Sequence, residues 1–578
     1  MIKPLRFFYF ACVLLAGMTG ILQAEIVSAP KLLPGGTFFV LTAPDFGKIR
    51  SFTASSSKGQ LWNDPVMKPF RSRFMEHFNK SIIAQIESEL KMNPIEEFDL
   101  LKGQITWAMA RPETGTDFDE LQWILLMDTK DQAEKLESVY QKILTELRET
   151  ETPMESKLIR NIQMTSLPPD STADNQPLHF GRIETIFLAG NSISLIEKIL
   201  ARKDDPSIPS LADSELFNED YNKRLRGRVA YAWLDFEFIK QELKMEETTP
   251  PSTGSVTGLE QMFDPEKLLS VLGISAIRSV SFTMSEKDRG LLMENFINVP
   301  ELERRGLMRI LIGEPKDSIP PGFVSSNVSK FYRGRWDLGN VWSSIENMVT
   351  GLNSEMGELL KIVLSTIGKD KDPHFDLKSS FLNNLGDDII SFSKPATSSP
   401  SDTDLRTLQN SRLLLVQSRN PTETMKAATI LMSLLPPPMN EAEVREFLGR
   451  KIYRFNLPKI ADSSGRTPSG LNTVEFTTEN DYLVASTSIS MLEEFLRSNS
   501  TETDPLNHLS GIHLAAEKVG GMATGFFGYE NNRDNIRIIL QKLKEDPDHL
   551  LSQLNLIDSI QADVVDGFNL DELKEWCQ

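Results

Sequence analysis

The sequence predicts an α+β protein of two tandem similar halves, each a mixed or antiparallel sheet covered by amphipathic helices. Two observations support this fold class. Blocks of similar sequence recur in one order along the chain, and short β-favouring runs are interspersed with segments of helical apolar periodicity. Strands and helices do not alternate one for one, which disfavours a doubly wound parallel sheet.

The duplication is clearest in a block of fourteen residues. FLAGNSISLIEKIL at Phe187–Leu200 and LVASTSISMLEEFL at Leu483–Leu496 share six identical positions at an offset of 296 residues. Five further pairs keep the same order: Phe39–Ile49 with Tyr332–Val341 (292 at the shared Asp), Leu101–Ile105 with Leu385–Ile389 (284), Ile124–Met127 with Leu413–Val416 (289), Gly227–Glu237 with Gly520–Glu530 (293), and Ile277–Val280 with Ile557–Ile560 (280). We therefore expect a signal peptide at 1–24, a first α+β half at 25–325 and a duplicate half at 326–578.

The first half opens with a strand and two helices. Thr37–Thr42 is a β-favouring run after a Pro-Gly-Gly turn, and Asp45 is placed to cap a short helix. A longer helix is expected to begin at Asp64-Pro65. Its apolar residues recur every four positions and define one buried stripe: Val66, Phe70, Phe74, Phe78, Ile82, Ile86 and Leu90.

Further elements follow from alternation and periodicity. Strands are expected at Gln104–Ala110, Trp123–Met127, Leu158–Leu167, Ile183–Ala189, Arg228–Leu234, Ser279–Thr283 and Gly290–Phe296, and helices at Ala133–Leu147 and Ser192–Ala201. Four segments rich in turn-forming residues are expected to be loops or linkers: Pro168–Pro177, Ile460–Leu471, Lys244–Leu259 and Pro395–Asp404. The first two are expected to emerge at equivalent corners of the two halves.

The N-terminus has the layout of a secretory signal peptide. Lys3 and Arg6 precede the uncharged apolar run Phe7–Leu22, which is shorter than the roughly 20 residues of a membrane span. We expect cleavage between Ala24 and Glu25, with an uncleaved anchor as the alternative. No other segment approaches a span, so the mature chain is expected in the periplasm, with secretion as the alternative.

Composition limits the partners of the mature chain. Loss of Lys3 and Arg6 with the signal leaves 60 basic against 81 acidic residues, a net charge of −21. Such a surface repels nucleic acid and anionic lipid. Cys577 is the single thiol that survives cleavage, so no intramolecular disulfide can form and the fold depends on its apolar core.

Three segments near the start of the mature chain carry a family resemblance. An apolar strand ends near Asp45, LWNDPVMKPF follows at Leu61–Phe70, and LKGQITWA follows at Leu101–Ala108. Together they resemble a domain-of-unknown-function family of exported bacterial proteins over residues 33–110. The second half lacks the Trp-Asn-Asp-Pro segment. The family has no established activity, so the resemblance implies a bacterial envelope protein and no functional residue.

No local motif for catalysis is present. The chain lacks a phosphate loop, a serine-hydrolase elbow, a zincin helix and an EF-hand loop. His508 and His513 are five residues apart and point to different faces of a helix, and Asp370, Asp372 and His374 would meet a cation only in an extended segment. We assign no catalytic, cofactor-binding or metal-binding residue and expect no cofactor.

Asp45 and Asp337 are the carboxylates that recur in both halves. Paired acids can perform acid–base chemistry when they lie close together. Each of these two nevertheless precedes an expected helix, where Asp accepts hydrogen bonds from unpaired backbone N–H groups. Helix capping is therefore the expected role of both.

These features favour an exported, non-catalytic binding or interaction protein whose partner is another envelope protein. A small-molecule or lipid carrier is the alternative, because 21 Met and 32 Phe side chains could line an adaptable apolar pocket. An enzyme whose catalytic groups converge only in space is the third reading.

Overall fold

The protein is described here from a computed structural model. Its described residues are 28–65, 68, 72, 100–112, 121–169, 176–245, 265–287, 290–394, 411–437, 439–458, 471–498, 504–531 and 533. The Ala24–Glu25 cleavage site, the long apolar stripe from Val66 to Leu90 and the block Ile557–Ile560 lie outside them. Within the described ranges, no helix is long and apolar enough to cross a membrane.

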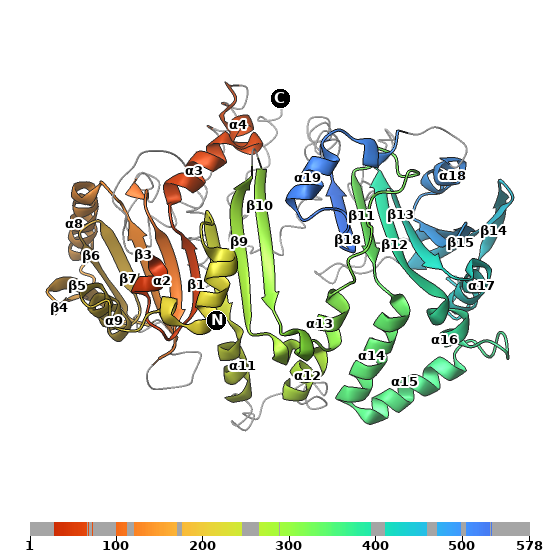
Figure 1. Ribbon diagram of the computed structural model, residues 1–578, viewed down its shortest axis with the longest axis horizontal. Coiled ribbons are helices and arrows are strands. Elements are labelled where there is room, and N and C mark those ends of the chain that lie inside the picture. The colour runs from red at the N-terminus through yellow and green to blue at the C-terminus, as the bar shows by residue number, and fades with distance from the viewer. Residues whose placement is uncertain are drawn as a thin grey trace. The chain divides into compact units, whose positions relative to one another are not determined.

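The chain forms two compact units (Figure 1), residues 1–255 with 275–303 and residues 256–274 with 304–578. The strands of the first unit are β1 Thr37–Ala43, β2 Ile105–Ala110, β3 Gln122–Asp128, β4 Glu155–Ile159, β5 Ile162–Leu167, β6 Leu178–Ile183, β7 Ile186–Gly190, β8 Ala230–Asp235, β9 Ser279–Lys287 and β10 Gly290–Asn298. Its helices include α2 Ala29–Leu32, α3 Phe46–Ser55, α4 Ser57–Asn63, α8 Ala133–Glu149, α9 Ile193–Asp204, α10 Glu215–Asp220 and α11 Phe236–Met245.

The second unit repeats this composition. Its strands are β11 Lys330–Arg335, β12 Leu385–Lys394, β13 Ser411–Ser418, β14 Glu443–Phe447, β15 Arg450–Pro458, β16 Leu471–Glu479, β17 Tyr482–Ser486 and β18 Phe526–Glu530. Its helices include α12 Pro265–Leu272, α13 Gly306–Leu311, α14 Leu338–Leu352, α15 Ser354–Thr366, α16 Leu377–Ser380, α17 Pro421–Met432, α18 Ile489–Ser498 and α19 Ile512–Lys518.

The two sheets have one strand order. The first runs β10-β9-β8-β1-β2-β3-β7-β6-β5-β4, and the second runs β18-β11-β12-β13-β17-β16-β15-β14. Every neighbouring pair is antiparallel. β18 therefore takes the place of β8, β11 that of β1, and so on to β14 and β4. The predicted α+β class with two similar halves is confirmed. Among the residues that the structure describes, the hairpin β9–β10 has a place only in the first sheet.

Three repeated blocks pair in the same register in both sheets. Leu125 lies between Trp107 and Ala189, and Leu414 lies between Ser391 and Ala485. The offsets between these equivalent residues are 284, 289 and 296, the values found in the sequence. Since a slip of one residue would turn each strand's core side chains to the other face, this agreement fixes the equivalence of the central strands.

The block at β8 and β18 is displaced from its predicted alignment. Thr42 pairs with Thr106 and Tyr231, while Arg333, which pairs with Ile390, also pairs with Phe527. Tyr231 is therefore structurally equivalent to Phe527. The offset between them is 296 residues, whereas the sequence alignment of this block predicted 293. The pairing is set by which side chains face the core, and the rings of Tyr231 and Phe527 are both buried.

Two predicted strands are wrong as single strands. Leu158–Leu167 is the hairpin β4–β5, turned at Arg160-Asn161 with φ of 46° and 63°. Ile183–Ala189 includes the turn between β6 and β7, where Glu184 has φ of 53°. These two-residue turns need positive φ, which Gly usually supplies, and neither contains one. Most residues of the expected polar loops Pro168–Pro177 and Ile460–Leu471 lie outside those that the structure describes. By sequence position the two segments follow the equivalent strands β5 and β15, and Leu471 begins β16.

Helices cover both faces of each sheet (Figure 1). In the first unit, Leu195 and Ile196 of α9 pack with Leu188 of β7, while Tyr140 and Leu144 of α8 pack with the adjacent Ala189 on the opposite face. In the second unit, α18 and α19 share one apolar cluster with the sheet, and α17 contacts β13, β16 and β17. Apolar side chains on the inward stripe of each helix thus form the cores.

Candidate functional site

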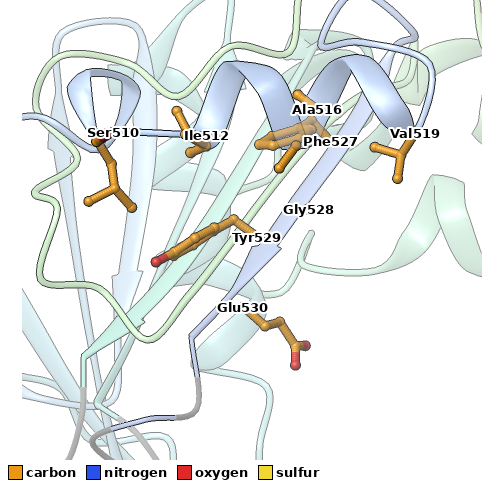
Figure 2. A pocket seen from close by; sticks show the side chains of 11 residues that line it. Ser510, Ile512, Ala516, Val519, Phe527, Gly528, Tyr529 and Glu530 are labelled. Carbon is orange, nitrogen blue, oxygen red and sulfur yellow. The ribbon is translucent and has the colours of Figure 1, made fainter. Parts of the chain in front are cut away.

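A pocket lies between helix α19 and the edge strand β18 of the second sheet (Figure 2). Its volume is about 410 Å³. Ile512 and Ala516 of the helix and Phe527 of the strand form a buried apolar wall, and Val519 lies exposed at the rim. Glu530 contributes the one carboxylate of the lining, and its oxygen accepts a hydrogen bond from Tyr332 and pairs with Lys330 at 3.4 Å.

In the first unit the strand equivalent to β18 is β8, and β9 pairs with it on the side away from β1. There Asp220, at the end of α10, is 1% exposed and accepts hydrogen bonds from Trp233 Nε1 at 3.0 Å and from Ser279 Oγ at 2.5 Å. Ser279 begins β9, so this buried carboxylate ties α10 to both β8 and β9. In the described part of the second sheet β18 is the last strand, and the pocket lies beside it.

Helix α15 presents a second surface of interest. Met356, Leu359, Ile362 and Val363 form its exposed apolar stripe, with exposed fractions of 36%, 60%, 57% and 45%. They recur at a spacing of three to four residues and so share one side of the helix. Leu364, on another side, packs against the cluster around Phe375 and Leu377. The helix is therefore apolar on its packed side and also on a side that faces water.

A buried ionic cluster joins three strands of the second sheet. Asp388 is 2% exposed and accepts two hydrogen bonds from Arg333, at 2.9 and 2.7 Å, and one from the hydroxyl of Tyr482 at 2.8 Å. Burial and the charge of Asp388 raise the pKa of Tyr482 to about 12. Tyr482 thus stays protonated at neutral pH and Asp388 is fully paired, which suits a structural bond better than proton transfer.

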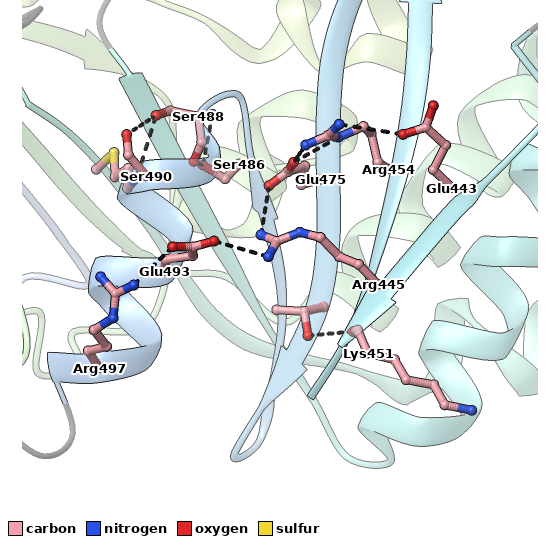
Figure 3. Close-up of polar contacts among 12 residues, drawn as sticks. Glu443, Arg445, Lys451, Arg454, Glu475, Ser486, Ser488, Ser490, Glu493 and Arg497 are labelled. Atoms are coloured by element: carbon pink, nitrogen blue, oxygen red, sulfur yellow. Dashed lines mark hydrogen bonds and ion pairs between the residues drawn. The ribbon is translucent and has the colours of Figure 1, made fainter. Parts of the chain in front are cut away.

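A second ionic cluster surrounds Glu475 (Figure 3). Glu475 is 2% exposed, and Arg454 donates to its Oε1 at 3.0 and 2.9 Å. Arg445 lies 4.0 Å from the other oxygen and pairs with Glu493 at 3.0 Å, and Arg497 pairs with Glu493 at 3.0 Å. The carboxylates and guanidinium groups neutralise one another and join β14, β15, β16 and α18, so this cluster is also structural.

Both recurring aspartates cap helices, as predicted. Asp45 accepts a hydrogen bond from the Lys48 backbone N–H at 3.3 Å at the start of α3, and Asp337 accepts one from that of Asn340 at 3.1 Å at the start of α14. Asp45 also pairs with Lys130 at 3.1 Å. Their place before equivalent helices explains the repetition.

The histidine and aspartate segments are not brought into a common site. Asp372 pairs with Lys426 at 2.8 Å and accepts the backbone N–H of His374 at 3.0 Å. His513 Nε2 contacts the Asn507 carbonyl oxygen at 2.9 Å. Among the described residues, no group of three His, Cys, Asp or Glu side chains could hold a metal ion.

Sequence reasoning missed both the pocket and the exposed stripe. The sequence does contain a signal for the stripe. Apolar residues extend around more of helix α15 than the single stripe that one packed face would require. The sequence contains no local signal for the pocket, because the pocket depends on the order of the strands in the folded sheet.

Comparison with known proteins adds no identification. No family model matches the chain, and no curated protein matches it. A solved structure titled "Structure of crystal form III of TP0453" aligns with 7% sequence identity and a TM-score of 0.24, over 48% of this chain and 82% of that chain. A similarity this low supports no statement about fold or function.

Proposed function

We propose that this is an exported, non-catalytic interaction protein that docks an envelope partner on the exposed apolar stripe of α15. The observation that carries the proposal is the exposure of Leu359 and Ile362, at 60% and 57%, beside Met356 and Val363 on one side of a helix. Contiguous exposed apolar surface rimmed by charge is typical of protein interaction sites. Glu358, which lies beside the stripe and pairs with Lys361 at 2.8 Å, supplies charge at its edge.

Two further observations support the proposal. The N-terminal sequence has the layout of an export signal, and residues 33–110 resemble a family of exported bacterial proteins without known activity. The most buried carboxylates of the second unit, Asp388 and Glu475, are held by arginines and not presented to solvent. This arrangement suits an interaction protein, which requires an exposed binding surface and does not require a reactive side chain.

Site-specific photocrosslinking in intact cells tests the proposal. In one variant a photoreactive amino acid replaces Leu359 in the stripe. In a second variant it replaces Lys361, which lies about 160° around the helix from Leu359. We expect a discrete adduct of one mass from position 359 and none from position 361. Because Ile362 shares the stripe, Ile362→Lys should remove the adduct, whereas the matched variant Lys361→Glu, which changes the charge about 160° around the helix from Leu359, should retain it.

The result that overturns the proposal is equally specific. Equal adducts from 359 and 361, or none from either in properly exported protein, would show that the stripe has no dedicated partner. Circular dichroism and thermal melts of Ile362→Lys should match those of the parent chain, because a substitution at an exposed position changes stability little.

A further inference from the structure

We propose that the second unit binds a neutral saccharide on a platform of three aromatic side chains, Tyr332, Trp336 and Phe526. Tyr332 lies on β11, Trp336 follows the end of that strand, and Phe526 begins β18. The centroid of the Phe526 ring is 6.4 Å from that of Tyr332 and 5.7 Å from that of Trp336, with angles of 19° and 35° between the ring planes. Rings this close to parallel form one broad surface instead of the walls of a cage.

Two glycines allow the outer rings to lie against the sheet. A Cβ on Gly334 would lie 2.0 Å from Cζ3 of Trp336, and a Cβ on Gly528 would lie 2.9 Å from Cδ1 of Tyr332. Glycine inside a strand commonly marks a place where another group approaches the backbone closely. Each of these rings therefore covers the backbone of a glycine with one face and turns its other face away from the sheet. Phe526, on the same face of the sheet, is 48% exposed.

The first unit uses the equivalent positions differently. By strand register, Ala43 is equivalent to Gly334 and Ala230 to Phe526. Both alanines are buried, at 3% and 5% exposure, and they share an apolar cluster with Phe46 of α3. The duplicated strands thus carry small side chains beneath a helix in one unit and a largely exposed ring in the other. A cluster of exposed rings that the shared fold does not require is typical of a binding surface.

The border of the platform carries charges of both signs. At one end, Glu530 accepts a hydrogen bond from the Tyr332 hydroxyl and pairs with Lys330 at 3.4 Å. At the other end, Glu314 pairs with Lys316 at 3.2 Å on a segment that begins beside the indole ring. Carboxylates accept hydrogen bonds and ammonium groups donate them, so both kinds of partner for a hydroxyl group are present. Because neither sign is in excess, the border suits a neutral ligand.

A sugar ring has the matching chemistry. A pyranose ring with equatorial hydroxyl groups has flat faces of C–H groups, and the negative π-face of an aromatic ring attracts these hydrogens. Its hydroxyl groups point outward from the edge of the ring, where the charged border can meet them. A quaternary ammonium ion favours rings that surround it, and a proline-rich segment favours a groove between rings. The nearly parallel rings of the platform provide neither.

Calorimetric titration of the full mature chain tests the proposal. The probes are three neutral oligosaccharides: cellohexaose, chitohexaose and maltohexaose. We expect at least one of them to bind. Phe526→Leu keeps an apolar side chain and removes the ring, so it should weaken that binding by about tenfold or more, the usual effect of losing one stacked aromatic ring. The matched variant Phe526→Tyr keeps the ring and should bind as the parent chain does.

A second pair of variants acts on the platform from the sheet beneath it. Gly528→Ala places a methyl group 2.9 Å from the Tyr332 ring, which must then move, so binding should weaken although every aromatic side chain remains. The matched variant is Gly322→Ala, where a Cβ would meet nothing within 4 Å, and it should bind as the parent chain does. Thermal melts of the Phe526 variants should match those of the parent, because the position is exposed.

Three outcomes would overturn the proposal. Binding of none of the three oligosaccharides at millimolar concentration would show that the platform does not bind a saccharide. Equal affinities for Phe526→Leu and Phe526→Tyr would place a bound saccharide elsewhere. Binding of tetramethylammonium or of a decaproline peptide in place of the sugars, with loss of that binding in Phe526→Leu, would assign the platform to a cation or to a proline-rich partner.

Discussion

Removal of the Phe217 ring should destabilise the first unit strongly. Phe217 is 0% exposed, its ring meets Trp233 edge-on at 5.1 Å, and it stacks on Tyr221 at 5.6 Å. Truncation of a buried Phe to Ala usually lowers the free energy of unfolding by about 3–5 kcal/mol, and each aromatic pair adds about 0.5–1.5 kcal/mol. Two such pairs place Phe217→Ala near the top of the range, at about 4–5 kcal/mol.

Urea denaturation followed by tryptophan fluorescence measures this loss, since Trp233 touches the missing ring. With a denaturant slope of about 3 kcal/mol per molar urea, the transition midpoint should fall by roughly 1.3–1.7 M. The matched control is Leu158→Ala on β4, because Leu158 is 71% exposed and should change the free energy of unfolding by less than about 0.5 kcal/mol. A fall below about 0.3 M for Phe217→Ala, at unchanged slope, would show that the ring does not hold α10 to β8.

Three further predictions concern charge and processing. Asp388→Ala should lower the free energy of unfolding of the second unit by about 3–5 kcal/mol, because it leaves the Arg333 guanidinium buried without its partner. Denaturant melts measure this loss. The matched control is Asp387→Ala, which removes a more exposed carboxylate and should cost less. Burial raises the pKa of Asp128, so the native state holds that proton more tightly than the unfolded chain does; this stabilisation is present below the unfolded-state pKa and is lost as pH rises through the native pKa. As pH rises from about 3 to 6, the free energy of unfolding of Asp128→Asn should therefore fall less than that of the parent chain. Identical pH profiles for the two proteins would contradict the raised pKa of Asp128. N-terminal sequencing of protein from the envelope fraction should begin at Glu25, and an intact Met1 there would refute cleavage after Ala24.

The sequence predicted which central strands of the two sheets are equivalent, with strand ends that differ from the structure by one residue. Leu125 and Leu414 occupy equivalent positions because apolar alternation survives where each strand faces a core, while surface residues diverge. The same logic placed the caps at Asp45 and Asp337, since a cap depends on a few adjacent residues.

Features that depend on distant partners were not predictable in this way. The turn at Arg160-Asn161 has no glycine, and its positive φ is maintained by the pairing of β4 with β5. The register of Tyr231 against Phe527 is set across the sheet through β1 and β11. The pocket beside β18 depends on the end of a sheet whose strands come from the whole second half of the chain.

Each sheet joins its earliest central strand to a strand made much later. β1 pairs with β8 through Phe39 and Leu234, and β11 pairs with β18 through Phe331 and Tyr529, so the partners are 195 and 198 positions apart in the sequence. Pairings this distant give a high contact order, and proteins rich in them fold slowly. Neither sheet can close until nearly all of its half has been synthesised. During that delay the apolar faces of the unpaired strands remain exposed, and such transiently exposed faces are the surfaces through which folding intermediates aggregate.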